Sequence, residues 1–502
     1  MVSPNLSEMR SLMEQALGKS MDIVYRDFLL GQGQRRGLLV CIIGLAADEK
    51  VESILEGVTR YTYPPFQPPM AGDPVLLLKE TVVQLPQCLT TRELQRAVEA
   101  VLAGESALFV DGSSHALLLD TRWDPGRAVS EPEAEAEVRG PRDGMVENIM
   151  VNLALLRRRI RDPRLRIEAL KVGERTRTDV ALLYIEGVAP RPLVQEVRRR
   201  VKRIQIDTGA GSGFIEELIR DSPLSPFPMS LSTERPDRIA DNLLEGRVTI
   251  LVDTTPFALV VPVTLWQMLQ APGDYYQSFW AGSSFRLLRL LALGLGLTLP
   301  SLYVILTTFH HEMIPTPLAL NVAAGREGTP FPTMLEVLLM IVMFEVLHEA
   351  GLRLPRPVGQ TVSIVGALVI GEAAVAAGLI APATVIVIAT TGITGFALPV
   401  YALSTTIRLI RLPLLLLSGT LGVFGFISGT AVIVLHLSSL RSFGQPYLSP
   451  VAPVSPAEWG DTLVRVPWWQ MTRRPQLGMG RRTRRMPSGQ TPGPDAGQEG
   501  PP

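Results

Sequence analysis

Residues 287–309 read LLRLLALGLGLTLPSLYVILTTF, an almost unbroken apolar run in which Arg289 is the single charged residue. As an α-helix rising 1.5 Å per residue, this run is long enough to cross a hydrocarbon core about 30 Å thick. The sequence therefore predicts an α-helical, multi-pass membrane domain over residues 286–440. Three further apolar stretches are expected to span it, over 362–380, 383–403 and 412–437.

The overall composition also favours a protein with a membrane-embedded part. Of the 502 residues, 46% are hydrophobic and only 19% are charged, and the mean hydropathy is +0.23. Lys and Arg total 48, as do Asp and Glu, and this zero formal charge argues against a nucleic-acid-binding protein. Because residues 1–20 lack an apolar core behind a basic start, no secretory signal is expected. We therefore predict that the N-terminal region is cytoplasmic.

The residues before the apolar half have the pattern of a soluble α/β region. LLVCII at 38–43 is a continuous apolar run that ends at Gly44, typical of a strand covered on both faces. ALLYIEG at 181–187 repeats it, and polar hairpin turns follow at Asp111 and Asp253, at nearly the same spacing from the two glycines. We interpret this repeat as two related subdomains, with coincidental spacing as the alternative. Their expected boundaries are 1–124 and 125–285.

The segment 334–352 is apolar but carries ionisable residues. Glu345, Glu349 and Arg353 are successive i, i+4 positions of a helix, and His348 lies beside them. Such a stripe is costly in lipid, so it must face water, protein or a pore. We predict an amphipathic or re-entrant element, or a span buried inside an assembly. Glu345 and Glu349 are candidate pore residues, and pairing between subunits, for example of Glu349 with Arg353, is the alternative.

Glu372 lies in the middle of the apolar stretch 362–380. An ionisable residue inside a membrane span indicates a functional role by default. Glu372 either lines a pore or is protonated and hydrogen-bonded between helices. Its small neighbours Gly371 and Ala373 favour the second interpretation, because small residues let helices approach closely.

The sequence offers no arrangement of residues typical of catalysis or metal binding. Adjacent histidines in His310-His311-Glu312 cannot both face one ion from a helix. Cys41 and Cys88 have no visible base partner and are expected in the core. We therefore predict a protein that is not an enzyme and that binds no cofactor or metal.

The C-terminal residues 441–502 are rich in Pro, Gly and Arg, with six arginines between 473 and 485, and are predicted to be a disordered basic tail. Four spans with a non-spanning 334–352 place this tail in the cytoplasm, whereas five spans place it outside. The positive-inside rule separates the two only weakly, and we prefer four spans because the tail is the larger basic cluster.

Motifs along nearly the whole chain, from about Asp22 to about Arg441, resemble one family. That family comprises the A subunits of bacterial spore germinant receptors, the GerA family. The motifs are VRGPR at 138–142, NLALLRRRI at 152–160, TERPDR at 233–238, DYY at 274–276, HEMIPT at 311–316, EAGLRLP at 349–355 and GQTVSIVG at 359–366.

The resemblance implies a non-enzymatic subunit of a nutrient-sensing complex in the inner spore membrane. It implies a transporter-like B subunit and a lipoprotein C subunit as partners. It also implies a homo-oligomeric ring that forms an ion channel and releases monovalent cations to start germination. The alternatives are a small-solute transporter, for which the spans are too few, and a membrane-anchored scaffold or enzyme.

Overall fold

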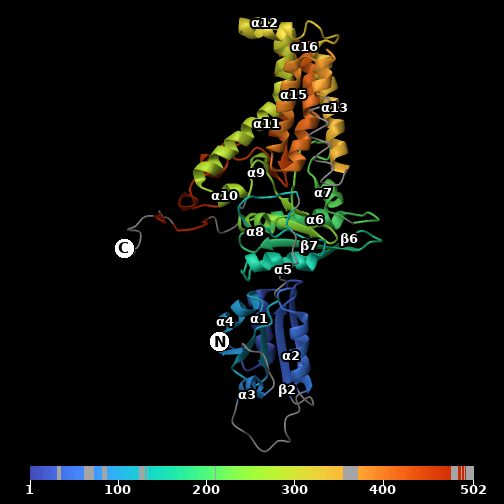
Figure 1. The fold of residues 1–502 in the computed structure, drawn as a ribbon. Coiled ribbons are helices and arrows are strands. Elements are labelled where there is room, and N and C mark those ends of the chain that lie inside the picture. The colour runs from blue at the N-terminus through green and yellow to red at the C-terminus, as the bar shows by residue number, and fades with distance from the viewer. Residues whose placement is uncertain are drawn as a thin grey trace, which may run out of the picture. The chain divides into compact units, whose positions relative to one another are not determined.

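The computed structural model describes most of the chain in two compact units (Figure 1). The α/β unit comprises Met1–Pro223, Ser230–Pro262 and Trp468–Pro502, and the helical unit comprises Leu224–Met229 and Val263–Pro467. The described residues are 1–30, 35–60, 73–81, 88–123, 131–132, 134–209, 211–353, 371–475, 484–487, 489–490 and 492.

The α/β unit begins with a five-stranded sheet whose neighbouring strands are all antiparallel. In sequence order its strands are β1 (Ile23–Leu30), β2 (Arg35–Ile42), β3 (Cys88–Thr91), β4 (Ser106–Val110) and β5 (Ala116–Leu119), and their spatial order is β1-β2-β4-β5-β3. The helices are α1 (Leu6–Leu17), α2 (Asp48–Arg60), α3 (Pro74–Thr81) and α4 (Leu94–Leu102).

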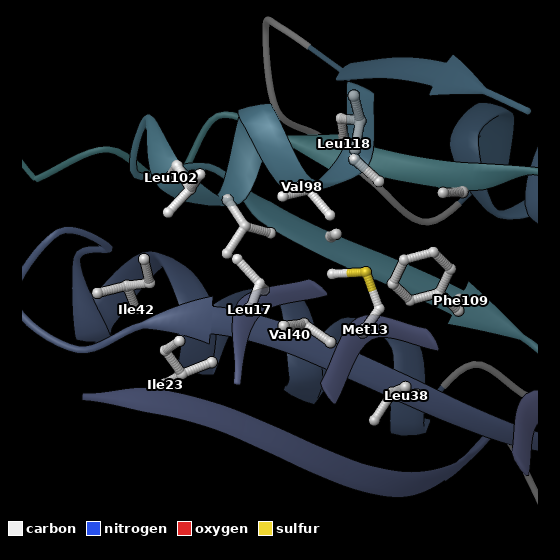
Figure 2. Packing of buried hydrophobic residues seen from close by; sticks show 14 of the residues in the cluster. Met13, Leu17, Ile23, Leu38, Val40, Ile42, Val98, Leu102, Phe109 and Leu118 are labelled. Atoms are coloured by element: carbon white, nitrogen blue, oxygen red, sulfur yellow. The ribbon is translucent and has the colours of Figure 1, made fainter. Parts of the chain in front are cut away.

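Hydrophobic clusters cover both faces of this first sheet. Met13 and Leu17 of α1 pack against Val40 and Phe109 on one face, as Figure 2 shows. Leu39, the neighbour of Val40, belongs to the cluster on the opposite face. Successive side chains of a strand point to opposite faces, so a strand covered twice needs an unbroken apolar run, as predicted for 38–43.

A second five-stranded antiparallel sheet follows with the same topology. Its strands are β6 (Leu165–Val172), β7 (Thr178–Ile185), β8 (Leu231–Thr233), β9 (Val248–Val252) and β10 (Ala258–Val261), in the spatial order β6-β7-β9-β10-β8. Its helices are α5 (Ile149–Arg159), α6 (Arg191–Arg203), α7 (Ser212–Ile219) and α8 (Pro236–Leu244).

The two sheets match in local detail as well as in strand order. Gly44 and Gly187, which end the second strand of each sheet, both have φ of +81°, a conformation that glycine adopts without strain. Ile43 forms a parallel β-bridge with Ala46, and Glu186 forms the corresponding bridge with Ala189. The shared strand order is what the hypothesis of two related subdomains requires.

The helical unit is built mainly from long apolar helices. Its helices are α9 (Leu265–Met268), α10 (Gly273–Tyr276), α11 (Phe279–Thr308), α12 (Thr316–Ala324), α13 (Thr333–Arg353), α15 (Pro382–Phe396) and α16 (Tyr401–Ser439), and residues 371–376 are also helical. A buried cluster that includes Val304, Val337, Ile388 and Leu415 joins α11, α13, α15 and α16. Among the described residues, α11 and α16 are each long enough and apolar enough to cross a membrane.

The segment named α16 folds back on itself at Gly422. The hydroxyl of Thr406 donates to the carbonyl of Pro226 (2.7 Å), and the His436 ring lies 3.0 Å from the hydroxyl of Ser225, the preceding residue. Thr406 and His436 would lie about 45 Å apart in a straight helix. Gly422 has φ +61° and ψ −140°, a conformation that essentially only glycine adopts. The prediction of one span over 412–437 is therefore corrected to a helical hairpin.

The other predicted spans differ from the structure in their bounds. The helix α11 contains almost all of 287–309 and begins earlier, at Phe279. The stretch 383–403 is interrupted, because α15 ends at Phe396 and α16 begins at Tyr401. Residues 362–370 of the stretch 362–380 lie outside the described residues, and residues 371–376 are helical. The helical unit begins its main segment at Val263 rather than at 286.

The first part of the predicted disordered tail is folded. Residues Arg441–Ser442 (β11) pair with Gln445–Pro446 (β12), and the side chain of Tyr447 is fully buried in the helical unit. The Ser442 hydroxyl donates to the carbonyl of Met229 (2.7 Å). The expectation of disorder, based on Pro and Gly content, overlooked these apolar and hydrogen-bonding anchors. Residues 476–483 and most of 488–502 lie outside the described part of the chain.

Candidate functional site

Two arginines of α16 hold Glu345, the first of the predicted site residues. Glu345 Oε2 lies 3.1 Å from Arg408 Nη1, and Glu345 Oε1 lies 3.1 Å from Arg411 Nη2. The Arg411 side chain is only 7% exposed, whereas that of Glu345 is 34% exposed. Since α13 contributes the carboxylate and α16 both guanidinium groups, this ion-pair cluster joins the two helices and carries one excess positive charge.

Glu349 and Arg353 pair with each other one turn further along α13. Arg353 Nη2 lies 2.7 Å from Glu349 Oε1, and both side chains are mostly exposed in the single chain. The alternative drawn from the sequence placed this pairing between subunits, whereas in the single chain the pair forms within one helix. This leaves the ionisable stripe of α13 in two parts, one paired across helices and one on the surface.

His348 lies on the same helix between these two parts. Its ring centroid lies 6.1 Å from that of Phe396, at the end of α15. Its Nε2 atom is buried and has no hydrogen-bond partner among the described residues. Glu372 is exposed in the helical segment 371–376, and within the described residues no hydrogen bond or ion pair joins it to the α13 stripe. The structure therefore brings together only part of the predicted site.

A buried charge cluster at the start of α11 was not anticipated. Asp274 is fully buried, with Arg286 Nε at 3.1 Å and Arg289 Nη1 at 2.7 Å from its Oδ2. Arg286 also binds Asp461 Oδ1 at 2.8 Å, and the Tyr275 hydroxyl donates to the same carboxylate. In the sequence, Asp274 and Tyr275 belong to a family motif, but nothing there indicated Asp461, which lies in the presumed tail.

Glu336, at the start of α13, is a second residue whose role the sequence did not reveal. Its side chain is fully buried, and Oε2 accepts hydrogen bonds from the Ala381 backbone N–H (3.3 Å) and the Thr384 hydroxyl (3.0 Å). In the sequence, Glu336 was only one charge among several near 334–352. Its burial distinguishes it, because a carboxylate is rarely buried without a cationic partner.

Metal-binding groups and thiols give no indication of a reactive centre in the described part of the chain. No group of three or more His, Cys, Asp or Glu residues there is placed to hold a metal ion. Cys41 is buried and Cys88 half-buried, and both are free thiols. Burial raises the pKa of the Cys41 thiol to about 11, so this group is un-ionised at neutral pH.

Comparison with known proteins identifies the family. Residues 11–477 match the family model described as the Bacillus/Clostridium GerA spore germination protein. The chain belongs to the GerA family. The motifs of this GerA chain that suggested the resemblance, including the DYY of 274–276, lie within the matched residues.

Relatives of this GerA chain match it over nearly its full length. Spore germination protein KA of Bacillus subtilis (strain 168) is 41% identical over 95% of this chain and 87% of its own length. Spore germination protein GerLA of Bacillus cereus is 36% identical over 94% of this chain and 95% of its own length. The membrane protein YfkQ of Bacillus subtilis, described as uncharacterized, is 40% identical over 94% of this chain and 91% of its own length.

A solved structure also resembles part of the GerA chain. It is the crystal structure of the N-terminal domain of the A subunit of the Bacillus megaterium spore germinant receptor GerK3. The identity is 33%, the match covers 52% of this chain and 96% of that chain, and the TM-score is 0.42.

Proposed function

We propose that this GerA chain is the membrane subunit of a spore nutrient-germinant receptor and conducts monovalent cations as a homo-oligomer. The observation that carries the proposal is the ionisable stripe of α13 among apolar helices. Glu349 and Arg353 are exposed near the end of α13, and the first half of this helix packs into the buried cluster with α11, α15 and α16. Charged groups at such a position must face water, protein or a pore.

The candidate site residues divide into two proposed roles. Glu349, Glu372 and Arg353 are exposed in the single chain and are the candidates for lining a pore or vestibule, where rings of carboxylates attract cations. Glu345 and His348 are candidates for coupling, because Glu345 links α13 to α16 and His348 lies against the end of α15. A movement of α16 relative to α13 would break the Glu345 ion pairs.

The partners and the membrane arrangement are part of the same proposal. The chain is proposed to work with a transporter-like B subunit and a lipoprotein C subunit in the inner spore membrane, with the α/β unit in the cytoplasm. No enzymatic activity is proposed. Signalling would follow if ligand binding to a partner favoured one of two arrangements of the helices.

Cation flux through proteoliposomes that contain the purified full-length chain tests the conducting role. We expect passive efflux of potassium or sodium, and a lower preference for cations over anions in Glu349→Gln, because one charge is lost from each subunit. Glu174→Gln is the matched control, since Glu174 is exposed in the α/β unit.

Two results would contradict a channel. Saturable counterflow would indicate a carrier, and the absence of any flux, also with partner subunits present, would indicate a scaffold. The mass of the detergent-solubilised particle tests oligomerisation separately, and a monomer would exclude a pore built between subunits.

A further inference from the structure

The carboxylate of Glu336 on α13 is hydrogen-bonded to α15 through one oxygen, Oε2, whereas its other oxygen, Oε1, has no hydrogen-bond partner among the described residues. Its Oε2 accepts from the Ala381 backbone N–H and from the Thr384 hydroxyl, both at the start of α15. Its Oε1 is equally buried, and no donor of the described residues reaches it. The side chain as a whole is 0% exposed.

The hydrogen bonds around Glu336 have a defined direction. The Thr384 hydroxyl has a single proton, which it donates to the Glu336 carboxylate. The Tyr303 hydroxyl, 3.2 Å from Thr384 Oγ1, must therefore donate to it. This chain from Tyr303 through Thr384 to Glu336 joins α11, α15 and α13, and it ends on a carboxylate that receives only neutral donors.

The surroundings of Glu336 contain little compensating charge. No Lys, Arg or His of the described residues forms an ion pair with it. Thr384 of α15 contacts the carboxylate, and Val337, the next residue of α13, belongs to a buried apolar cluster with Ile388 and Leu415. A buried carboxylate is normally paired, bound to a metal ion or protonated.

We propose that Glu336 binds one alkali-metal ion at Oε1. An alkali-metal ion prefers oxygen ligands, and this site offers carboxylate and hydroxyl oxygens. The chain also leaves helical geometry between Ala377 and Ala381, with φ of +66° at Gly378, and such breaks free backbone carbonyls for cations. The bound cation would hold α13 to α15, whether or not the protein conducts ions.

Thermal unfolding of the full-length chain in detergent, followed by tryptophan fluorescence, tests the site. The midpoint is compared at equal ionic strength in choline, sodium and potassium chloride at pH 8. We expect the wild-type midpoint to rise by several degrees in sodium or potassium chloride relative to choline chloride, and the salt that acts identifies the cation. Glu336→Gln should lose this rise, because its amide carries no charge.

Glu327→Gln is the matched control, since Glu327 is exposed next to Arg326 and should leave the rise intact. If Glu336→Gln fails to fold, Tyr303→Phe is tested in its place. This variant keeps the Glu336 carboxylate and removes the Tyr303 hydroxyl, which hydrogen-bonds to Thr384. Tyr303→Phe should then require more sodium or potassium chloride for the same rise. A wild-type midpoint equal in all three buffers would overturn the proposal, and so would a Glu336→Gln response equal to that of the wild type.

Discussion

Asp22 and Arg157 form an ion pair that is closed to solvent and joins the parts of the α/β unit that contain its two sheets. Arg157 Nε and Nη2 donate to the two Asp22 oxygens at 2.7 and 3.2 Å, and the Asp22 and Arg157 side chains are 0% and 1% exposed. Asp22 precedes β1 of the first sheet, and Arg157 lies near the end of α5 beside the second. In the sequence, Arg157 belonged to the family motif NLALLRRRI, and nothing there indicated Asp22 as its partner.

Removing Asp22 should destabilise the α/β unit strongly. Asp22→Ala leaves a buried guanidinium unpaired, and breaking such a pair costs about 3–5 kcal/mol. Hydrogen exchange of the full-length chain should therefore show lost protection in α5 and β1. Asp179→Ala is the control, because the Lys171–Asp179 pair is exposed and contributes less than about 1 kcal/mol. Equal protection in both variants would show that the buried pair is not needed.

The reversal at Gly422 predicts a short distance between the two arms of α16. Leu409 and Leu435 are both exposed and lie equally far before and after Gly422 in the chain. In a straight helix they would be separated by about 40 Å. Spin labels at these positions, in a background without Cys41 and Cys88, should instead lie within about 20 Å in a helical hairpin with adjacent arms. A distance close to the straight-helix value would rule out the hairpin.

Close packing of the two arms predicts a defect in Gly425→Leu. A Cβ atom at Gly425 would overlap the carbonyl oxygen of Leu417 on the first arm. The substitution should lower the thermal midpoint or the yield of folded protein in detergent, because backbone cannot yield as a flexible side chain does. Gly294→Leu is the control, since nothing lies within 4 Å of a Cβ there. Equal yields would contradict the close packing.

The two cysteines should differ in reactivity towards a maleimide. The pKa of Cys41 is raised to about 11 by burial, with a smaller effect of Asp48, so the reactive thiolate is scarce at pH 8. Cys88 is half-buried. Native protein should therefore label at Cys88 alone, and Cys88→Ser should stay unlabelled until it is denatured. Rapid labelling of folded Cys88→Ser would show that Cys41 is accessible.

Truncations should separate the folded and the dispensable parts of the C-terminal region. Removal of residues 476–502 should leave a folded chain, because the buried contacts of Tyr447 and Asp461 are kept. Removal of 441–502 takes both away and leaves Arg286 without one of its two carboxylate partners. Size-exclusion chromatography in detergent should show aggregation of the shorter chain only, and equally dispersed chains would contradict a structural role for 441–475.

Several features of the fold could be predicted because they depend on local patterns. The apolar run at 38–43 indicated a doubly covered strand, since a strand with two buried faces cannot alternate. The spacing from Gly44 to Asp111, nearly repeated from Gly187 to Asp253, indicated two similar units, because similar turns recur at nearly the same distances. The helix over 334–352 and its ionisable stripe followed from the helical period alone.

The remaining features depend on contacts between residues far apart in the chain. Glu345 of α13 meets Arg411 of α16, and Asp274 and Asp461, from opposite ends of the helical unit's sequence, both meet Arg286. Hydropathy records how apolar a segment is and cannot register a reversal such as that at Gly422, because the sequence on both sides of Gly422 is largely apolar. The sequence by itself therefore determined composition, periodicity and family, whereas the tertiary structure alone decided which charges meet, since pairing requires proximity in space.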